Sequence, residues 1–339
     1  MKRYAAAIVA AIVVAVVAIF TYTCTPPDNR PKPDGRLPIS IGGHTTQLGA
    51  SLIIAEKKGL YAKHNLNASI RLVESSRESM AAMEAGAFDV VIGSLAAGSF
   101  NMVHKGDLVI LADASRVIPS VIIRKDLWDN KSIQQLSDLK GRAIMTPREG
   151  SSSYYALSKI LRGVGLTIAD INPKYLEDNA TLAALEAKQI DAAILNEPHA
   201  TNAVEKGIGV RFDLKQVEKF FPQNGQQHMV LYTRRKTLEE KRELLRSFLA
   251  AYIEAVRFYD TARNGKQSER EEAVGIIAEY THSDRATVDK SVWPYVSPDG
   301  RPDVSYIKEM HDYFVQQKLI DNPVNLDSVV RLELLPESK

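Results

Sequence analysis

An internal repeat constrains the fold of this 339-residue chain more than any other feature of its sequence. Residues 80–93 read MAAMEAGAFDVVIG and residues 182–195 read LAALEAKQIDAAIL, with six of fourteen positions identical at a constant offset of 102. Alanine-rich helices can match by chance, but the elements around this match recur in the same order. The repeat therefore predicts two similar lobes of roughly a hundred residues each.

The segments around the repeat alternate between strands and helices. Residues 39–41 and 143–145 are candidate strands at equivalent places, and a polar turn and a helix follow each of them. Gly59 and Gly165, each followed by leucine, stand where those helices end, as glycine often does beyond the last helical turn. Further strands, such as residues 70–73, continue the alternation. This order predicts an α/β fold in which each lobe has a largely parallel sheet.

The chain is expected to cross between the two lobes twice. Residues 120–126 and 227–235 are apolar segments that begin and end the second copy, so we interpret them as crossovers and as a two-segment hinge. Residues 238–260 and the chain beyond them are mostly helical, with an aromatic and apolar face, and are expected to pack back on the first lobe. The first lobe then comprises residues 37–120 and 232–339, and the second lobe residues 121–231.

The N-terminal segment has the pattern of an exported, membrane-attached protein. Lys2 and Arg3 precede the uncharged apolar residues 5–20, an order typical of a signal peptide or signal anchor, which we assign to residues 1–23. Cys24, the only cysteine, follows; it is either lipidated or lies beside an uncleaved anchor. Residues 24–36 contain four prolines among polar residues and are interpreted as an extended tether. Either alternative places the protein at the periplasmic or extracellular face of the cytoplasmic membrane.

Charge balance and missing motifs exclude several classes of function. The chain has 43 Lys and Arg against 41 Asp and Glu, and Lys2 and Arg3 account for the difference. A folded part that is formally neutral offers no basic surface for nucleic acid. The sequence contains no nucleophile elbow, phosphate loop, zinc-protease motif or dinucleotide fingerprint, and its seven histidines show no metal-ligand spacing. We therefore expect no enzyme activity, no cofactor and no metal.

Polar residues recur where the two predicted lobes begin their helices. These residues are Thr45, Thr46 and Gln47 in the first copy and Gly150, Ser151, Ser152 and Ser153 in the second. Helix N-termini carry unpaired N–H groups and bind anions readily. Serine and threonine are also favoured helix caps whatever the function, and this alternative stays open. Their occurrence at equivalent places in both copies favours a ligand site in a cleft between the lobes.

Other candidate ligand-binding residues follow the strands of the repeat. Ser94 and Asn196 stand at equivalent places and offer neutral hydrogen bonds. Glu197 either accepts a hydrogen bond from a ligand or lies in solvent, and Arg148 either pairs with an anionic ligand or lies in solvent. The remaining predicted ligand-binding residues are His44, Ser120 and His228.

Several segments together resemble the periplasmic substrate-binding proteins for nitrate, sulfonate and taurine. Residues 55–66, AEKKGLYAKHNL, are similar to a motif of this family, as are residues 83–89, 139–144, 150–152 and 191–198. The resemblance covers roughly residues 37–330. It implies a type II periplasmic-binding fold of two Rossmann-like lobes that closes like a hinged clam. It also implies a monomer that delivers a small molecule to the permease and ATPase of an ABC importer. Relatives often carry tryptophan where Asn196 stands, which puts an aromatic wall there in doubt.

The nature of the ligand is left with two alternatives. Neutral donors at two opposed helix N-termini favour a small organic anion, such as a sulfonate or carboxylate. A carboxylate at Glu197 would instead favour an N–H-rich heterocycle, such as a pyrimidine. The family also resembles the thiamine-pyrimidine synthase of fungi, an enzyme with pyridoxal phosphate and a cysteine-rich motif, but Cys24 is the sole cysteine and lies outside the expected folded body. A third hypothesis for the function is a membrane-tethered sensor that binds a ligand and signals to a partner without transport.

Overall fold

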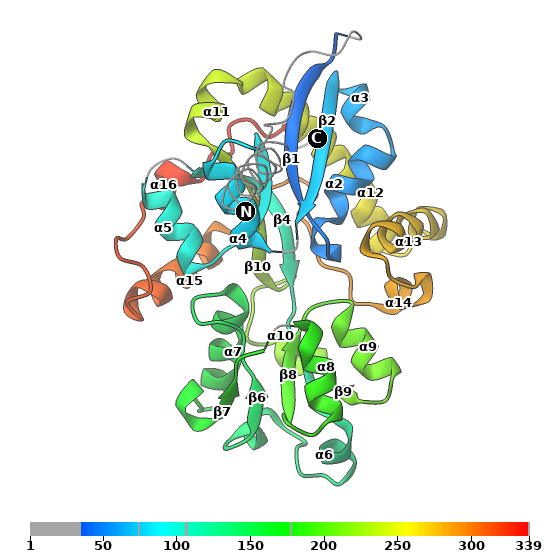
Figure 1. Ribbon diagram of the computed structural model, residues 1–339, viewed down its shortest axis with the longest axis vertical. Helices are drawn as coiled ribbons and strands as arrows, with labels where there is room; N and C mark the ends of the chain where they lie inside the picture. Colours follow the sequence, from blue (N-terminus) through cyan, green and yellow to red (C-terminus); the bar gives the residue numbers. More distant parts are fainter. Residues whose placement is uncertain (1–34, 74, 106–107, 177, 338–339) are drawn as a thin grey trace, which may run out of the picture.

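The computed structural model describes residues 35–73, 75–105, 108–176 and 178–337, which form two α/β lobes, one above the other (Figure 1). The predicted signal peptide or anchor, Cys24 and all but the last two residues of the predicted tether lie outside these residues. Across the part of the chain that the structure describes, no helix has the length and apolar character needed to cross a membrane.

The first lobe is built on a five-stranded sheet whose strand order is β2-β1-β3-β10-β4. The strands are β1 Leu37–His44, β2 Leu66–Val73, β3 Val90–Ser94, β4 Leu108–Val117 and β10 Gln226–Arg234. Strand β1 pairs parallel with β2 and β3, whereas β10 runs antiparallel to both of its neighbours. Ile39, Ile41 and Val90 are among the buried residues that hold this sheet against its helices. Four of the five strands therefore run in one direction, as the alternating pattern predicts.

The second lobe repeats this arrangement in a sheet of order β7-β6-β8-β5-β9. Its strands are β5 Ser120–Arg124, β6 Ala143–Met145, β7 Asn172–Lys174, β8 Ala192–Leu195 and β9 Gly209–Arg211. Strand β6 pairs parallel with β7 and β8, and β5 is antiparallel to β8 and β9. In each sheet the reversed strand is fourth in order. The two similar lobes predicted from the repeat are confirmed.

The matched sequences of the repeat form the same helix, turn and strand in both lobes. Helix α4 Ser76–Glu84 and helix α8 Asp178–Glu186 coincide at the offset of the repeat, and strands β3 and β8 follow them. The repeated aspartate has a structural role in both copies. Asp89 Oδ2 accepts a hydrogen bond of 2.9 Å from Ser40 N on β1, and Asp191 Oδ2 accepts one of 2.9 Å from Ala143 N on β6. Each aspartate thus ties the start of the second strand of its copy to the neighbouring strand.

Helices cover both faces of the first sheet. On one face, α2 Ala50–Lys57, α12 Arg242–Arg263 and α13 Gln267–Thr281 pack in one apolar cluster with the strands. On the other face, α5 Ala97–Lys105 and α15 Val304–Gln316 pack with α4. The expectation that the chain after residue 238 returns to the first lobe is confirmed. The other helices are α3 Leu60–Lys63, α6 Lys125–Asp129, α7 Ser152–Gly163, α9 His199–Glu205, α10 Leu214–Glu218, α11 Arg235–Glu240, α14 Arg285–Lys290 and α16 Leu326–Val329.

The predicted crossovers are wrong in position. Strand β5 belongs wholly to the second sheet and β10 wholly to the first, so residues 120–126 and 227–235 do not cross between the lobes. Their apolar character reflects burial inside a sheet. The chain crosses at Ile118 and Pro119, between β4 and β5, and again at residues 219–225, between α10 and β10. We therefore propose a first lobe of residues 37–117 and 226–337 around a second lobe of residues 120–218.

Candidate functional site

A cavity of about 220 Å³ lies between the two lobes, beside both crossing segments. The first lobe contributes Gln47, Leu48, Arg116 and Arg263, and the second contributes Ser120, Leu195, Asn196, Glu197 and Glu218. A third wall comes from the segment of Val292, Trp293, Pro294 and Tyr295. The last residue of β4, Val117, and the crossing residues Ile118, Pro119 and Asn224 complete the lining. The lining therefore includes Gln47, Ser120, Asn196 and Glu197 of the predicted ligand-binding residues.

Glu197 does not lie in solvent, which was one of the two roles expected from its sequence position. It is buried, and its Oε1 forms an ion pair of 2.7 Å with Arg211 Nη1 on strand β9. Its Oε2 accepts a hydrogen bond from Thr201 N, and Oε1 accepts one of 3.2 Å from Val292 N across the lobe boundary. Arg211 also donates to Ser120 Oγ at 2.6 Å. The negative charge of Glu197 is thus compensated within the protein, so it does not oppose an anionic ligand.

Gln47 presents an unpaired polar atom at the cavity wall. The side chain is buried, its Oε1 lies 3.0 Å from Ser291 Oγ, and its Nε2 has no hydrogen-bond partner. Because the single hydroxyl proton of Ser291 also lies within reach of Val288 O, at 2.7 Å, the free amide atom is Nε2 or Oε1 according to its orientation. One buried amide atom of this lining residue therefore lacks the hydrogen-bond partner that buried polar atoms normally have.

Two arginines flank an aromatic ring on the same wall. The guanidinium carbons of Arg116 and Arg263 lie 5.3 and 5.2 Å from the centre of the Tyr295 ring. The Nε atoms of both are buried and make no hydrogen bond. Arg116 Nε lies 3.2 Å from Asp113 Oδ2 in an ion pair, and Arg263 Nη2 lies 3.4 Å from Asp260 Oδ1. Two cations therefore border the cavity, each beside a carboxylate of the protein.

The predicted histidines lie in a second polar cluster between the lobes. His228 Nδ1 lies 3.1 Å from Ser152 Oγ of the second lobe, and His44 Nδ1 lies 3.0 Å from Thr46 Oγ1. Burial lowers the pKa of His44 to about 4, and burial with the nearby His44 lowers the pKa of His228 to about 4. Both imidazoles are therefore neutral at pH 7. These residues are absent from the cavity lining, and each has a partner within the protein.

The serine turn before α7 is mainly a helix cap. Ser151 Oγ accepts a hydrogen bond of 3.1 Å from Tyr154 N, so the capping alternative is correct for this residue. Gly150 has a φ of 79°, which favours glycine, and its carbonyl accepts a hydrogen bond of 2.8 Å from Ala97 N of the first lobe. Ser153 lies within the first turn of α7. The turn joins the two lobes, but it does not line the cavity.

The remaining predicted residues also lie away from the cavity lining. Thr45 N donates to Val73 O at 3.2 Å, which extends the pairing of β1 with β2. Ser94 N donates to Ser76 Oγ at 3.0 Å and so ties the end of β3 to the start of α4. Arg148 is exposed. No group of three or more His, Cys, Asp or Glu side chains suited to a metal ion occurs among the residues described.

The lobes also contact each other through an aromatic interface. Tyr155 of α7 is fully buried within the apolar cluster of the first lobe. Its ring centre lies 4.9 Å from that of Tyr313 and 6.1 Å from that of Phe314, both on α15, and its hydroxyl donates to Glu309 Oε1 at 2.7 Å. On the opposite side of the molecule, Lys290 forms an ion pair with Glu205 of the second lobe. The two lobes therefore contact each other through an aromatic cluster and through an ion pair.

Comparison with known proteins identifies relatives that are described as binding proteins. A predicted binding protein of Brucella abortus (strain 2308) is 25% identical over 254 residues, which cover 75% of this chain and 74% of the relative. A predicted aliphatic sulfonates-binding protein of Escherichia coli (strain K12) is 28% identical over 155 residues, which cover 44% of this chain and 43% of the relative.

Solved structures share the fold. The periplasmic aliphatic sulphonate binding protein SsuA of Escherichia coli matches with a TM-score of 0.72 at 19% identity, over 89% of this chain and 94% of that chain. The periplasmic nitrate-binding protein NrtA of Synechocystis PCC 6803 matches with a TM-score of 0.70 at 14% identity, over 88% of this chain and 86% of that chain. The predicted periplasmic-binding fold is therefore confirmed. Because the model of the NMT1-like family matches residues 37–278, well over half of the sequence, this chain belongs to the NMT1-like family.

Proposed function

We propose that this protein is the solute-binding component of an ABC importer, and that it binds a small organic anion of the sulfonate or carboxylate type between its lobes. The observation that most directly supports this proposal is the arrangement of charges around the cavity. Arg116 and Arg263 border it with partly exposed guanidinium side chains, while the buried carboxylate of Glu197 is neutralised by Arg211. Hydrogen bonds from guanidinium groups to anions are among the stronger ones in proteins.

The rest of the lining supports an organic anion rather than a bare inorganic one. Leu48, Ile118, Leu195 and Trp293 contribute apolar surface next to the arginines. A ligand with a short hydrocarbon part would bury that part against these side chains, while its acidic group meets the guanidinium groups. The sulfonate and nitrate ligands in the names of the relatives fit the same charge preference. Glu197 was the main reason to consider a pyrimidine-like ligand, and its ion pair removes that reason.

The remaining parts of the proposed function concern location and partners. The relatives of known structure include periplasmic binding proteins, and the relatives found are binding proteins rather than enzymes. We propose that this chain likewise catalyses nothing, works as a monomer with a permease and an ATPase, and is tethered through its N-terminal residues. Deletion of residues 1–36 should release a folded, monomeric protein from the membrane fraction. Retention of the deleted form in that fraction would contradict the tether.

A ligand screen with matched variants tests the site. Thermal-shift measurements with sulfonates, carboxylates, nitrate and pyrimidines identify ligands, and calorimetry then measures their Kd. The buffers contain no sulfonates, because a sulfonate buffer would compete with the ligand for the cavity. A ligand at a hundred times its Kd adds about 2.7 kcal/mol of stability. Arg263→Met should raise the Kd of an anion by roughly tenfold or more, because it removes a charged donor. Arg71→Met is the control, since Arg71 also lies over an aromatic ring, 4.5 Å from the centre of Phe88, but is absent from the cavity lining.

The outcomes separate the two ligand classes. Anion binding that Arg263→Met weakens and Arg71→Met leaves unchanged supports the proposal. Stabilisation by pyrimidines alone, with no response to any anion, would reassign the protein to a vitamin-precursor class.

A further inference from the structure

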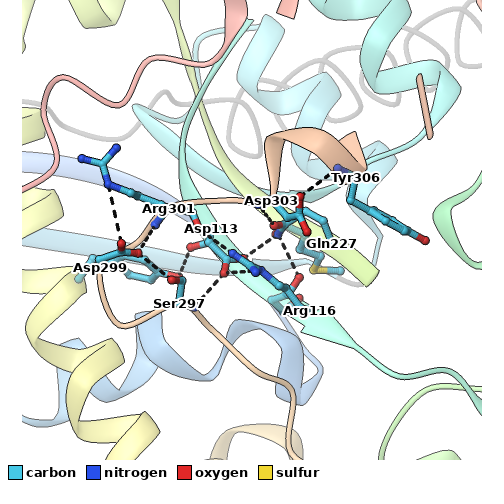
Figure 2. Close-up of polar contacts among 11 residues, drawn as sticks. Asp113, Arg116, Gln227, Ser297, Asp299, Arg301, Asp303 and Tyr306 are labelled. Carbon is cyan, nitrogen blue, oxygen red and sulfur yellow. Dashed lines mark hydrogen bonds and ion pairs between the residues drawn. The ribbon is translucent and has the colours of Figure 1, made fainter. Parts of the chain in front are cut away.

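A buried carboxylate lies directly behind the arginine wall of the cavity. Asp113 on β4 is fully buried, and Figure 2 shows it at the centre of a polar network. Its Oδ1 accepts a hydrogen bond of 2.6 Å from Gln227 Nε2 on β10, and its Oδ2 accepts one of 2.9 Å from Ser297 N. The same Oδ2 lies 3.2 Å from Arg116 Nε. Asp113 therefore contacts an arginine that borders the cavity, although Asp113 itself is not part of the lining.

The position of Arg116 does not depend on this carboxylate alone. Arg116 Nη2 donates to Arg301 O at 2.6 Å. The backbone of Arg116 pairs with Tyr295 in both directions, at 2.7 and 2.9 Å. These bonds to uncharged partners hold the guanidinium at the cavity wall whether Asp113 is ionised or not. A change in the charge of Asp113 therefore alters the electrostatic potential of the cavity more than it alters the position of Arg116.

We propose that Asp113 is a built-in counter-charge that limits how strongly the cavity attracts an anion, by neutralising Arg116 from behind. This inference rests on the proposed function. When Asp113 carries a proton, the positive charge of Arg116 is no longer compensated, and the attraction of the cavity for an anion rises. Anion affinity should accordingly increase as the solution becomes more acidic.

The surroundings of Asp113 allow its protonation in an accessible range. Burial, opposed by Arg116, raises the pKa of Asp113 to about 6. Of the elements packed around Asp113, β10 contributes the neutral Gln227 and α12 contributes Tyr252. The hydroxyl of Tyr252 donates a hydrogen bond to Asp113 O, and burial raises the pKa of this hydroxyl well above its usual value. The loop before α15 contributes the charged residues Asp299, Arg301 and Asp303; Asp299 Oδ2 lies 3.8 Å from Arg301 Nε, and Asp303 caps α15.

Other ionisable groups near the cavity behave differently. His44 and His228, with pKa values of about 4, remain neutral from about pH 5 upward. Glu197 is paired with Arg211, Asp260 lies beside Arg263, and Glu218 is exposed. His199 begins α9 two residues after Glu197, so its substitution is a necessary control.

The test is the Kd of butanesulfonate, measured by calorimetry from about pH 5 to about pH 7.5 in amine buffers as chloride salts. The charge of a sulfonate is constant over this range, so any pH dependence belongs to the protein. We expect the wild-type Kd to be roughly three- to tenfold lower at the acidic end. The isosteric variant Asp113→Asn should show the lower Kd throughout, with no pH dependence, and His199→Gln should keep the wild-type profile.

The wild-type profile keeps the inference testable even if Asp113→Asn folds poorly, which circular dichroism would reveal. Binding that is independent of pH, or weaker at acidic pH, would overturn the role of Asp113 and leave the proposed function standing. A folded Asp113→Asn variant that binds butanesulfonate more weakly would also overturn it. If no anion of the screen binds at any pH, the proposed function fails and this inference fails with it.

Discussion

The aromatic contact between the lobes offers a direct test of how the protein opens. Tyr155 belongs to the second lobe, yet its side chain is fully buried among aromatic residues of α15 in the first lobe. If ligand entry requires the lobes to separate as a whole, this contact exists only in the closed form. Tyr155→Ala should then favour the open form, while Tyr155→Phe, which removes only the hydroxyl bond to Glu309, should have a small effect.

The burial of Tyr155 sets the expected magnitude. Replacing a buried aromatic residue by alanine costs about 3–5 kcal/mol. Losing the hydroxyl bond costs about 1 kcal/mol, because Glu309 is half exposed and keeps its ion pair with Lys159. If about 3 kcal/mol is removed from the closed form alone, the Kd of a ligand that requires closure rises by up to roughly a hundredfold.

Small-angle scattering and calorimetry measure the two consequences together. Tyr155→Ala should show a larger radius of gyration than the wild type without ligand, and a higher Kd for the best ligand of the screen. Denaturant unfolding reports the loss of stability. A variant that loses stability but keeps the wild-type radius and Kd would refute the reasoning. The contact of α7 with α15 would then persist in both forms, and the lobes would pivot about it.

Three further predictions follow from polar contacts. Glu197→Gln should lower stability by about 3 kcal/mol in denaturant unfolding, because it leaves a cation unpaired, but anion binding should survive in calorimetry. Asp191→Asn should destabilise the second lobe without changing the Kd of the ligand, since the Asp191 carboxylate ties two strands together. A weaker affinity for the ligand in this variant would instead make Asp191 a ligand-binding residue. His44 and His228 resist protonation when folded, so the free energy of unfolding should fall as the pH drops from about 6.5 to about 4, by up to about 3 kcal/mol for each histidine. The raised pKa of Asp113 opposes this fall, because the folded protein then binds a proton that the unfolded chain does not. In denaturant unfolding, His228→Gln should lose less stability over this pH range than the wild type.

Most of what could be predicted about the fold from the sequence came from the internal repeat. An exact offset between two helix–strand units reports a shared supersecondary structure, and both copies of the unit were found where the repeat places them. The crossing points were missed because an apolar segment has the same composition in a buried strand as in a buried connection. Only the pairing of β10 with β3 and β4 assigns it to the first lobe.

Part of the cavity lining was predictable because it follows strands of the two copies. Gln47 and Asn196 lie just beyond strands of the two copies, and there the rule that ligands bind past strand ends applies. Arg116 precedes a crossing, Arg263 ends α12, and Tyr295 belongs to a loop of the C-terminal region. These three residues meet because distant parts of the chain return to the same place. No local pattern marks such a meeting.

The antiparallel pairing of β4 with β10 has a consequence for the order in which the chain folds. Val117 pairs with Gln226 at one end of this ladder, so the whole second lobe is the loop of a β-hairpin. The second lobe is continuous in sequence and can complete its sheet as soon as Arg211 has been synthesised. The first lobe must wait for β10, the strand between β3 and β4. A hairpin closed by so long a loop forms slowly unless its ends are held together. We therefore expect the second lobe to fold first during synthesis, and its compaction to bring the ends of β4 and β10 into reach of each other.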